Sequence, residues 1–125
     1  MICIIGGSGF VGTKLIASLN VNNCYNIDKN PSQSFNDFTA IGNICNPDQI
    51  KFSDKINTVV LLAAEHRDDV SPTNLYYKVN VDGTKNVLNE MDKQGVKHLI
   101  FTSSVAIYGL DKENPSENHP EDPFN

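Results

Sequence analysis

Three glycines stand where the chain could first bind a phosphate. The apolar run Ile2 to Ile5 is followed at once by GGSGFVG, residues 6 to 12. This order predicts a strand that turns sharply into a helix. Gly6, Gly9 and Gly12 lack Cβ atoms where the backbone must bend, where a pyrophosphate must approach, and where helix and strand must touch. Unpaired N–H groups at the helix start would then point at the phosphates. Glycine-rich turns can also be purely structural, and the motif alone leaves that alternative open.

An acidic residue stands at the distance that a dinucleotide site requires. The apolar segment Cys24 to Ile27 leads into Asp28, which lies 22 residues after Gly6. A carboxylate there accepts hydrogen bonds from the adenosine ribose hydroxyls and repels a 2′-phosphate, which favours NAD over NADP. Lys29 could offset part of that repulsion. The alternative is that Asp28 is an ordinary turn residue at the end of a strand.

The surrounding segments alternate between strand and helix patterns, which predicts a parallel sheet with helices on both faces. A helix is expected over Phe10 to Leu19, and a short helical turn near Pro47. A long helix is expected to begin at Ser71-Pro72, run to Met91 and end at Gly95, and its sheet-facing residues are Leu75, Val79, Val87, Leu88 and Met91. The predicted strands are Ile2 to Ile5, Cys24 to Ile27, Phe38 to Gly42, Thr58 to Leu62 and His98 to Thr102. Right-handed crossovers give the order 3-2-1-4-5 of a Rossmann-type doubly wound α/β fold.

The same pattern predicts that this fold is truncated. A doubly wound dinucleotide domain has two βαβαβ halves, and here the second half stops soon after its second strand. Residues 1–125 are therefore expected to form the N-terminal part of an NAD-binding Rossmann domain. The remainder of that domain and the substrate-binding part would lie outside these residues.

Composition excludes several classes of partner. The longest apolar run, Val59 to Ala64, is far shorter than the roughly 20 residues of a membrane-spanning helix, and no basic signal-peptide start is present. We expect a cytoplasmic protein with no membrane partner. The net charge of −5 is concentrated in residues 111 to 125, interpreted as a solvated loop, and no basic face indicates nucleic acid. Cys3, Cys24 and Cys45 are expected to be small core residues, and no metal site is predicted.

Four motifs in order resemble the extended short-chain dehydrogenase/reductase family, the nucleotide-sugar epimerases and dehydratases. They are IIGGSGFVG at residues 4 to 12, VLLAA at 60 to 64, NVDGT at 80 to 84 and FTSSVAIYG at 101 to 109. The resemblance covers nearly the whole chain. It implies NAD as cofactor, a nucleotide-sugar substrate, and Phe10 and Val11 as part of the cofactor-binding turn. It also implies a homodimer formed through the long helix, with Tyr76, Tyr77 and Val81 on its outer face.

The resemblance assigns cofactor contacts to the ends of two further strands. Small residues at Ala63 and Ala64, after Leu62, would let the cofactor lie against the backbone. The family has Asp before Ile after its third strand, whereas here Asn43 precedes Ile44. The Asn43 amide can still accept a hydrogen bond from the adenine amino group, and the Ile44 backbone remains available to the adenine edge.

Two polar residues match the family's active-site positions. Asn80 would hold the active-site architecture, although a satisfied buried Asn is the alternative. Ser104 matches the catalytic serine, whose hydroxyl reaches a substrate oxygen at the end of the fifth strand. Ser103 is its nearest competitor.

The family's chemistry also needs a Tyr and a Lys four residues apart on a helix, because the lysine lowers the tyrosine pKa. Tyr108 and Lys112 have this spacing, but Gly109 disfavours a helix and Tyr108 follows Ser104 too closely. The pair is therefore expected beyond Asn125, and residues 1–125 alone should bind NAD without turnover. The charged run from Glu65 to Asp69 could contact a ligand through His66 and Arg67, or could be a solvated loop with local ion pairs.

The sequence thus predicts the cofactor-binding portion of an NAD-dependent nucleotide-sugar epimerase or dehydratase, in which bound NAD transiently oxidises a sugar hydroxyl. Two alternatives stay open, a reductase of the same family and a non-catalytic dinucleotide-binding or sensing protein. A Tyr-x-x-x-Lys motif in a helical pattern after Asn125 would favour the enzymes.

Overall fold

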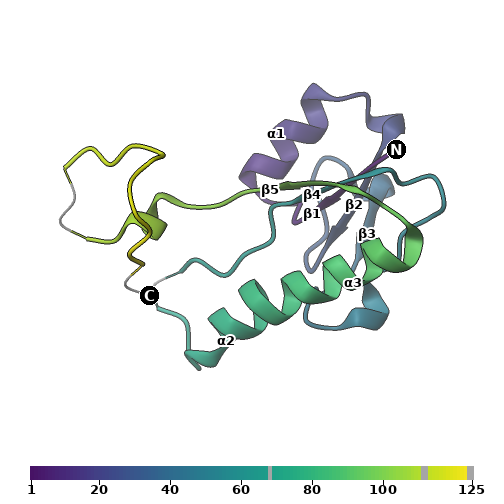
Figure 1. Ribbon diagram of the computed structural model, residues 1–125. Coiled ribbons are helices and arrows are strands. Elements are labelled where there is room, and N and C mark those ends of the chain that lie inside the picture. The colour runs from purple at the N-terminus through teal and green to yellow at the C-terminus, as the bar shows by residue number, and fades with distance from the viewer. Residues whose placement is uncertain (68, 111–112, 124–125) are drawn as a thin grey trace.

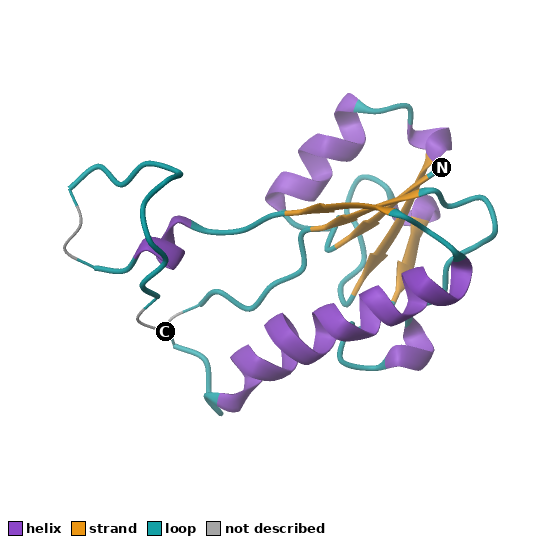
Figure 2. Cartoon of the chain, in the orientation of Figure 1, coloured by secondary structure: helices purple, strands orange, loops and turns teal. Residues whose placement is uncertain are grey.

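A twisted parallel sheet of five strands forms the centre of the molecule (Figures 1 and 2). The computed structural model describes residues 1–67, 69–110 and 113–123. The strand order is β3-β2-β1-β4-β5, so the predicted Rossmann-type α/β fold and its 3-2-1-4-5 order are confirmed. The strands are β1 (Ile2–Ile5), β2 (Cys24–Asp28), β3 (Thr39–Ile41), β4 (Thr58–Leu61) and β5 (His98–Phe101).

Helices cover both faces of the sheet (Figure 1). Helix α1 (Phe10–Ser18) lies on one face. On the other face a long helix is formed by α2 (Asn74–Tyr77), a π-helical segment (Lys78–Gly83) and α3 (Thr84–Gln94). It ends at Gly95, whose φ of 69° is left-handed, as a glycine C-cap predicts. Short 3₁₀ turns occupy Val21–Asn23, Asn36–Phe38, Pro47–Gln49 and Val105–Tyr108.

Alternation of side chains along the strands divides the core into two layers. Ile4 and Val60 pack with Ile16 of α1, whereas Val59 and Leu61 pack with the α3 side. Each fully buried side chain of this size contributes about 1.5–3 kcal/mol of transfer free energy. Because both faces are covered, the central strands are continuously apolar rather than alternating.

The cysteine prediction holds for two residues and is wrong for the third. Cys3 and Cys24 are buried, and burial raises the pKa of the Cys3 thiol to about 12, which makes it a poor nucleophile. Cys45 is half-buried and lines a cavity. It follows Ile44, which takes the core position, so the loop turns the next side chain outward.

The start of the long helix differs from the prediction. Pro72 lies in a turn before the helix, with its carbonyl accepting from the Leu75 N–H, and Thr73 is the N-cap. The regular pattern therefore begins at Asn74 instead of Ser71-Pro72. Leu88 is 40% exposed and does not face the sheet, because the buried positions of α3 are Val87, Glu90 and Met91.

Strand β5 forms one edge of the described sheet and is exposed along its whole length. The fractional exposure is 36% for Leu99 and 56% for Ile100 and Phe101. The chain then leaves the sheet, and residues 113–123 fold back so that the Asp122 N–H donates to the Ile107 carbonyl. Most of this acidic segment is exposed, as predicted for a solvated loop. Within the described parts of the chain, none of the helices has the length and apolar character needed to cross a membrane.

Candidate functional site

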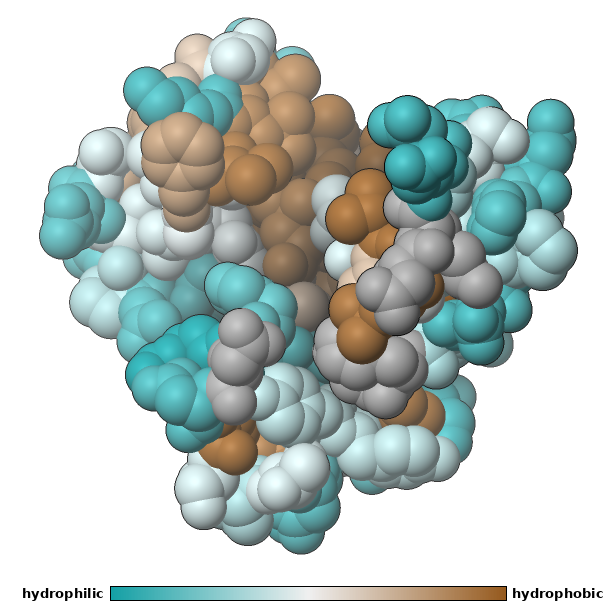
Figure 3. Space-filling view, turned by 90° about the vertical axis from the view of Figure 1, so that its left-hand side faces the viewer, coloured by the Kyte–Doolittle hydropathy of each residue, from teal (hydrophilic) through white to brown (hydrophobic). Residues whose placement is uncertain are grey.

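A cavity of about 530 Å³ opens at the carboxyl edge of the sheet, beside the switch between β1 and β4 where such folds bind ligands. Its volume lies in the usual range of cofactor and ligand sites. Figure 3 looks onto this end of the molecule and shows apolar residues gathered in a hollow between hydrophilic rims. Eight of the predicted cofactor-binding residues line the cavity, namely Gly6, Gly9, Asp28, Asn43, Ile44, Leu62, Ala63 and Ala64.

The glycine turn forms one wall of this cavity and needs glycine for reasons that differ along it. Gly6 has a φ of +89°, and a Cβ there would lie 2.6 Å from the Ala63 nitrogen. A Cβ on Gly12 would lie 2.3 Å from the Gly7 Cα, so this glycine lets α1 pack against the turn. A Cβ on Gly9 would meet only the Gly6 carbonyl oxygen at 3.6 Å, because the space above it is open to the cavity.

Helix α1 starts at this open space. Gly9 is its N-cap and supplies no side-chain acceptor, and the first turn contains no acidic residue. The N–H groups of Phe10 and Val11 therefore have no acceptor within the helix, which suits an anionic ligand. Phe10 and Val11 are 82% and 59% exposed, and neither lines the cavity, so their predicted role would fall to their backbone N–H groups.

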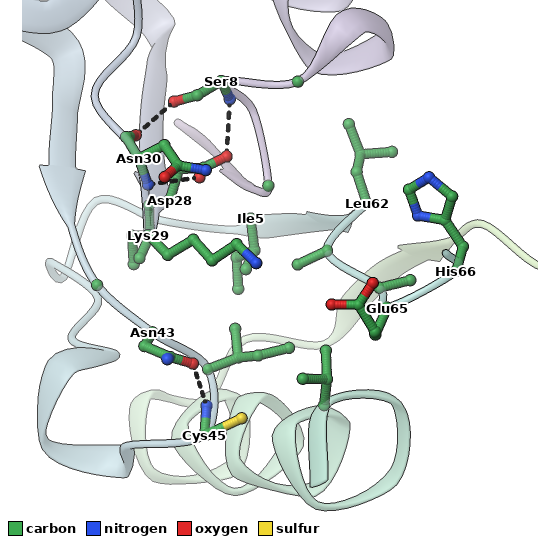
Figure 4. Close-up of a pocket in the computed structure, with 18 of the residues that line it drawn as sticks. Ile5, Ser8, Asp28, Lys29, Asn30, Asn43, Cys45, Leu62, Glu65 and His66 are labelled. Carbon is green, nitrogen blue, oxygen red and sulfur yellow. Dashed lines mark hydrogen bonds between the residues drawn. The ribbon is translucent and has the colours of Figure 1, made fainter. Parts of the chain in front are cut away.

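Asp28 lies at the end of β2 and is tied to the glycine turn (Figure 4). Its Oδ2 accepts from the Ser8 N–H and its Oδ1 from the Asn30 N–H, both at 2.9 Å. The Ser8 hydroxyl donates to the Asn30 carbonyl at 2.9 Å. A carboxylate has about four acceptor sites, so lone pairs remain for two ribose hydroxyls. Figure 4 also shows the Lys29 side chain extending into the cavity.

The loop after β3 forms the opposite wall. The Asn43 Oδ1 accepts from the Cys45 N–H at 3.0 Å, which uses part of the acceptor capacity that the sequence assigned to adenine. Ile44 is buried, and its carbonyl accepts from the Asn86 side chain of α3 at 2.8 Å. A Cβ on Gly83 would lie 2.7 Å from the Ile44 side chain, so the loop and the long helix are in close contact.

Beyond β4, the backbone of the third wall is fixed from two sides. The N–H groups of Leu62 and Ala63 both donate to the Ile5 carbonyl, at 2.8 and 2.9 Å. The Asn80 side chain then pairs with both backbone groups of Glu65, accepting from its N–H at 2.7 Å and donating to its carbonyl at 2.9 Å. Asn80 is exposed, so it is not the buried Asn of the alternative interpretation. It touches the wall without lining the cavity.

The charged loop after β4 both lines the cavity and forms a local ion pair, which are the two alternatives that the sequence left open. Glu65, His66 and Arg67 line the cavity. Arg67 also forms a two-pronged ion pair with Asp69, at 3.1 and 2.7 Å, in which both side chains are about 70% exposed. Such exposed pairs contribute little to stability. Asp68 lies outside the described residues.

Ser104 is separated from these walls. Its hydroxyl oxygen accepts from the Ala106 N–H at 3.1 Å and caps the 3₁₀ turn Val105–Tyr108. It lines a second, open hollow together with Ser103, Tyr108 and Glu117. The hydroxyl hydrogen of Ser104 stays available for a ligand because the capping bond uses only an acceptor site.

Two tyrosines, Tyr108 and Tyr25, have a lysine four residues later, and neither pair has the helical setting of a catalytic Tyr and Lys. The turn that contains Tyr108 ends there, and Gly109 has a φ of +79°, as expected from the sequence. Lys112 lies outside the described residues. Tyr25 and Lys29 have the same spacing but belong to the extended strand β2 and its end, and burial raises the pKa of Tyr25, opposite to what a general base requires.

Sequence reasoning missed several residues that line the cavity, among them Ser8, Asn30 and Cys45. Ser8 and Asn30 lie beside the glycines and Asp28, and their polar side chains at strand ends were the available signal. Nothing in the sequence indicated Cys45, because its orientation depends on how the loop after β3 turns.

Curated relatives and solved structures show what the chain is similar to. It is 56% identical to the N-acetyl-alpha-D-glucosaminyl-diphospho-ditrans,octacis-undecaprenol 4-epimerase of Escherichia coli O157:H7, over 99% of this chain and 38% of that protein. It is 32% identical to the UDP-glucose 4-epimerase of Vibrio cholerae, over 86% of this chain and 36% of that protein. The chain therefore spans well under half the length of these relatives.

A solved structure agrees with them. A short-chain dehydrogenase/reductase superfamily protein from Agrobacterium tumefaciens, with bound NAD, superposes with a TM-score of 0.84 at 25% identity, over 100% of this chain and 40% of that one. Residues 2–125 match the NAD-dependent epimerase/dehydratase family, whose description carries the cofactor that the sequence predicted. With the glycine turn, Asp28 and an apolar cavity on one sheet edge, the chain belongs to the NAD-dependent epimerase/dehydratase family, and its cofactor is NAD.

Proposed function

We propose that residues 1–125 carry the NAD-binding part of an enzyme that epimerises C4 of a sugar held through a diphosphate. The observation that carries this proposal is the similarity to a 4-epimerase at 56% identity along 99% of the chain. Bound NAD supplies reversible hydride transfer, which lets a sugar carbon lose and regain its hydrogen on opposite faces. The substrate class follows from the sugar diphosphates named in the two epimerases.

The chain's own residues would bind and orient the cofactor. The N–H groups at the start of α1 would bind the pyrophosphate, and Asp28 would accept from the adenosine ribose hydroxyls. Apolar walls that include Ile5, Leu62 and Val79 would exclude water from the reacting end. Ser104 would donate its free hydroxyl hydrogen to the reacting sugar oxygen.

We propose in addition that these residues are the N-terminal part of the cofactor domain. Exposure of β5 on both faces supports this, since an apolar strand of a parallel sheet is normally covered. The family's catalytic Tyr and Lys would then lie outside residues 1–125, and this segment by itself would bind NAD without turnover.

The group that carries the sugar through the diphosphate can be a polyprenol or a nucleoside, which gives two candidate substrates. The 56%-identical relative is named for a polyprenyl diphosphate sugar, and the 32%-identical one for a nucleoside diphosphate sugar. We expect an N-acetylhexosamine carried on a polyprenyl diphosphate to be the better substrate, because the more similar relative acts on that class.

The test uses the protein in its natural full length. NAD-loaded enzyme is incubated in parallel with N-acetylglucosaminyl-diphospho-undecaprenol and with UDP-N-acetylglucosamine, and the released sugars are identified by chromatography and NMR. Formation of the C4 epimer from either substrate supports the epimerase, and the ratio of rates identifies the carrier. Net accumulation of NADH would indicate net oxidation of the sugar, by a dehydrogenase or by a reductase acting in reverse, and loss of water would indicate a dehydratase. NAD binding with no product from either substrate would favour the non-catalytic alternative.

A further inference from the structure

Asn26, in the middle of β2, has a polar side chain at a buried position where strands of a parallel sheet usually have an apolar residue. Asn26 pairs with Ile4 on β1 and with Thr39 on β3, and its exposure is 0%. A buried amide without partners would be destabilising. Here every polar atom of the side chain is used, and within the described residues no buried side-chain nitrogen or oxygen lacks a partner.

The partners of Asn26 lie on two elements. Its Oδ1 accepts from the Gly7 N–H at 2.9 Å, and its Nδ2 donates to the Ser8 hydroxyl at 3.2 Å and to the Thr39 hydroxyl at 3.0 Å. The amide orientation is fixed by chemistry, because a backbone N–H can only donate. The Thr39 hydroxyl in turn donates to the Phe35 carbonyl at 2.7 Å, so it is free to accept from Asn26.

This contact also explains the second glycine of the turn. A Cβ on Gly7 would lie 2.3 Å from the Asn26 Oδ1. The amide can therefore reach the Gly7 N–H only because that residue has no side chain. Gly7 and Asn26 act as a pair, although 19 positions separate them in the chain.

Three successive N–H groups of the turn are held by β2. The Gly6 N–H donates to the Ile27 carbonyl, the Gly7 N–H to Asn26, and the Ser8 N–H to Asp28, each at 2.9 Å. The N–H groups that follow, at the start of α1, have no acceptor within the helix, and the space beside Gly9 is open. The middle one of these three bonds depends on the Asn26 side chain.

We infer that Asn26 is a positioning residue for the phosphate-binding turn, which fixes the direction of the α1 N–H groups and so sets the affinity for the diphosphate of the cofactor. The inference rests on the proposed NAD site. Without the amide, the Gly7 N–H would lose its acceptor, and a glycine peptide can rotate at little cost. The turn would then sample orientations in which α1 no longer points at the diphosphate.

The test measures binding of three ligands, NAD, ADP and adenosine, by calorimetry in the natural full-length protein. Asn26→Leu keeps the branching and the number of heavy atoms of the side chain and removes all three hydrogen bonds. Thr39→Val leaves the bond to the Gly7 N–H in place and removes the acceptor on β3, together with the hydroxyl's own bond to the Phe35 carbonyl. Val96→Ala is the matched control, because Val96 is buried in the core layer on the other face of the sheet.

Asn26→Leu should weaken NAD and ADP binding about tenfold, the scale of one or two lost hydrogen bonds, and adenosine binding less than about twofold. Thr39→Val should give a smaller loss with the same ligand pattern. Val96→Ala should lower the melting temperature with all three affinities unchanged. The difference between ADP and adenosine separates positioning from a general loss of structure, which would weaken both alike.

Unchanged ADP affinity in folded Asn26→Leu, or an equal loss for ADP and adenosine, would overturn the inference and leave the NAD site standing. If Asn26→Leu does not fold, Thr39→Val is judged by the same two criteria. If the natural protein binds none of the three ligands, the proposed function fails, and this inference fails with it.

Discussion

Gly6 and Gly9 belong to one turn, yet substitution should affect them differently. Gly6→Ala places a Cβ on a residue with φ of +89° and against the Ala63 backbone, so the free energy of unfolding should fall by about 2 kcal/mol or more. Gly9 has a φ of −75° and open space, so Gly9→Val should keep the fold and block the pyrophosphate. Thermal denaturation and NAD calorimetry on both variants measure this. A folded Gly9→Val that binds NAD as tightly as the parent contradicts the phosphate assignment.

Asp28 is expected to select NAD through its charge. Asp28→Asn retains acceptors for the Ser8 and Asn30 N–H groups only in part, and it removes the repulsion of a 2′-phosphate. The ratio of the NADP to the NAD dissociation constant should fall about tenfold, which is the scale of one charge-assisted hydrogen bond. Lys29, which lines the same cavity, would then attract the 2′-phosphate of NADP. Asp48→Asn, at an exposed acid outside the cavity, is the control. An unchanged ratio would make Asp28 a turn residue only.

Ser104 is expected to act on the substrate and not on the cofactor, because it lies outside the cofactor cavity. In the full-length enzyme, Ser104→Ala should lower kcat about 10²-fold or more while leaving NAD affinity nearly unchanged. Ser103→Ala, one position earlier in the same hollow, distinguishes the two serines. Steady-state kinetics and calorimetry on each variant provide the measurements. If Ser103→Ala shows the loss and Ser104→Ala does not, the catalytic role belongs to Ser103.

Among the elements, the long helix carries two contacts that shape the cavity. Its π-helical segment, Lys78–Gly83, contains Asn80, which binds Glu65 after β4, and Gly83, which packs on Ile44 after β3. Segments of this kind are frequent at functional sites because a widened turn redirects side chains. The long helix therefore fixes the positions of two walls of the site, the loop after β3 and the loop after β4.

Asn80→Ala should loosen the β4 wall without unfolding the helix. Two hydrogen bonds to the Glu65 backbone are lost, each worth about 1 kcal/mol. Amide hydrogen exchange at Glu65 should become faster, and NAD affinity should fall several-fold. Asn89→Ala, at an exposed position of the same helix, should change neither quantity. Equal exchange at Glu65 in both variants would show that the wall does not depend on Asn80.

For the whole molecule, the proposed homodimer would use the outer face of this long helix. Tyr77 and Leu88 are exposed, at 61% and 40%, and the half-buried Val81 lies between them on the same side at helical spacing. Tyr76 is not expected in this contact, because its hydroxyl donates to the Arg67 carbonyl and so holds the side chain against the loop after β4. Exposed apolar residues grouped in this way commonly mark an interface.

Tyr77→Glu should convert the dimer of the full-length protein to a monomer at micromolar concentration, because it places a charge within the apolar contact. Sedimentation velocity measures this directly. Lys93→Glu changes the charge of α3 on another side and should leave the dimer intact. A natural protein that sediments as a strict monomer at micromolar concentration would contradict the dimer itself.

The sequence by itself determined the strand order and the place of the site. Apolar runs such as Ile2 to Ile5 predict buried strands, and the glycine spacing together with Asp28 predicts where β1 and β2 end, because these signals are local. Eight predicted residues consequently meet in one cavity. Their chemical roles stay predictions until binding is measured.

Only the tertiary structure decided which side chains hold that site in shape. Asn26 and Gly7, Asn80 and Glu65, and Asn86 and Ile44 are far apart in the chain and adjacent in space. A polar residue within an apolar pattern indicates a partner but not its identity, since the partner is set by how strands and helix pack. The orientation of Cys45 toward the cavity and the exposure of Leu88 are likewise set by how the strands and the long helix pack. The local sequence pattern indicates whether a side chain tends to be buried or exposed, and the packing of strands and helices decides which way that side chain faces.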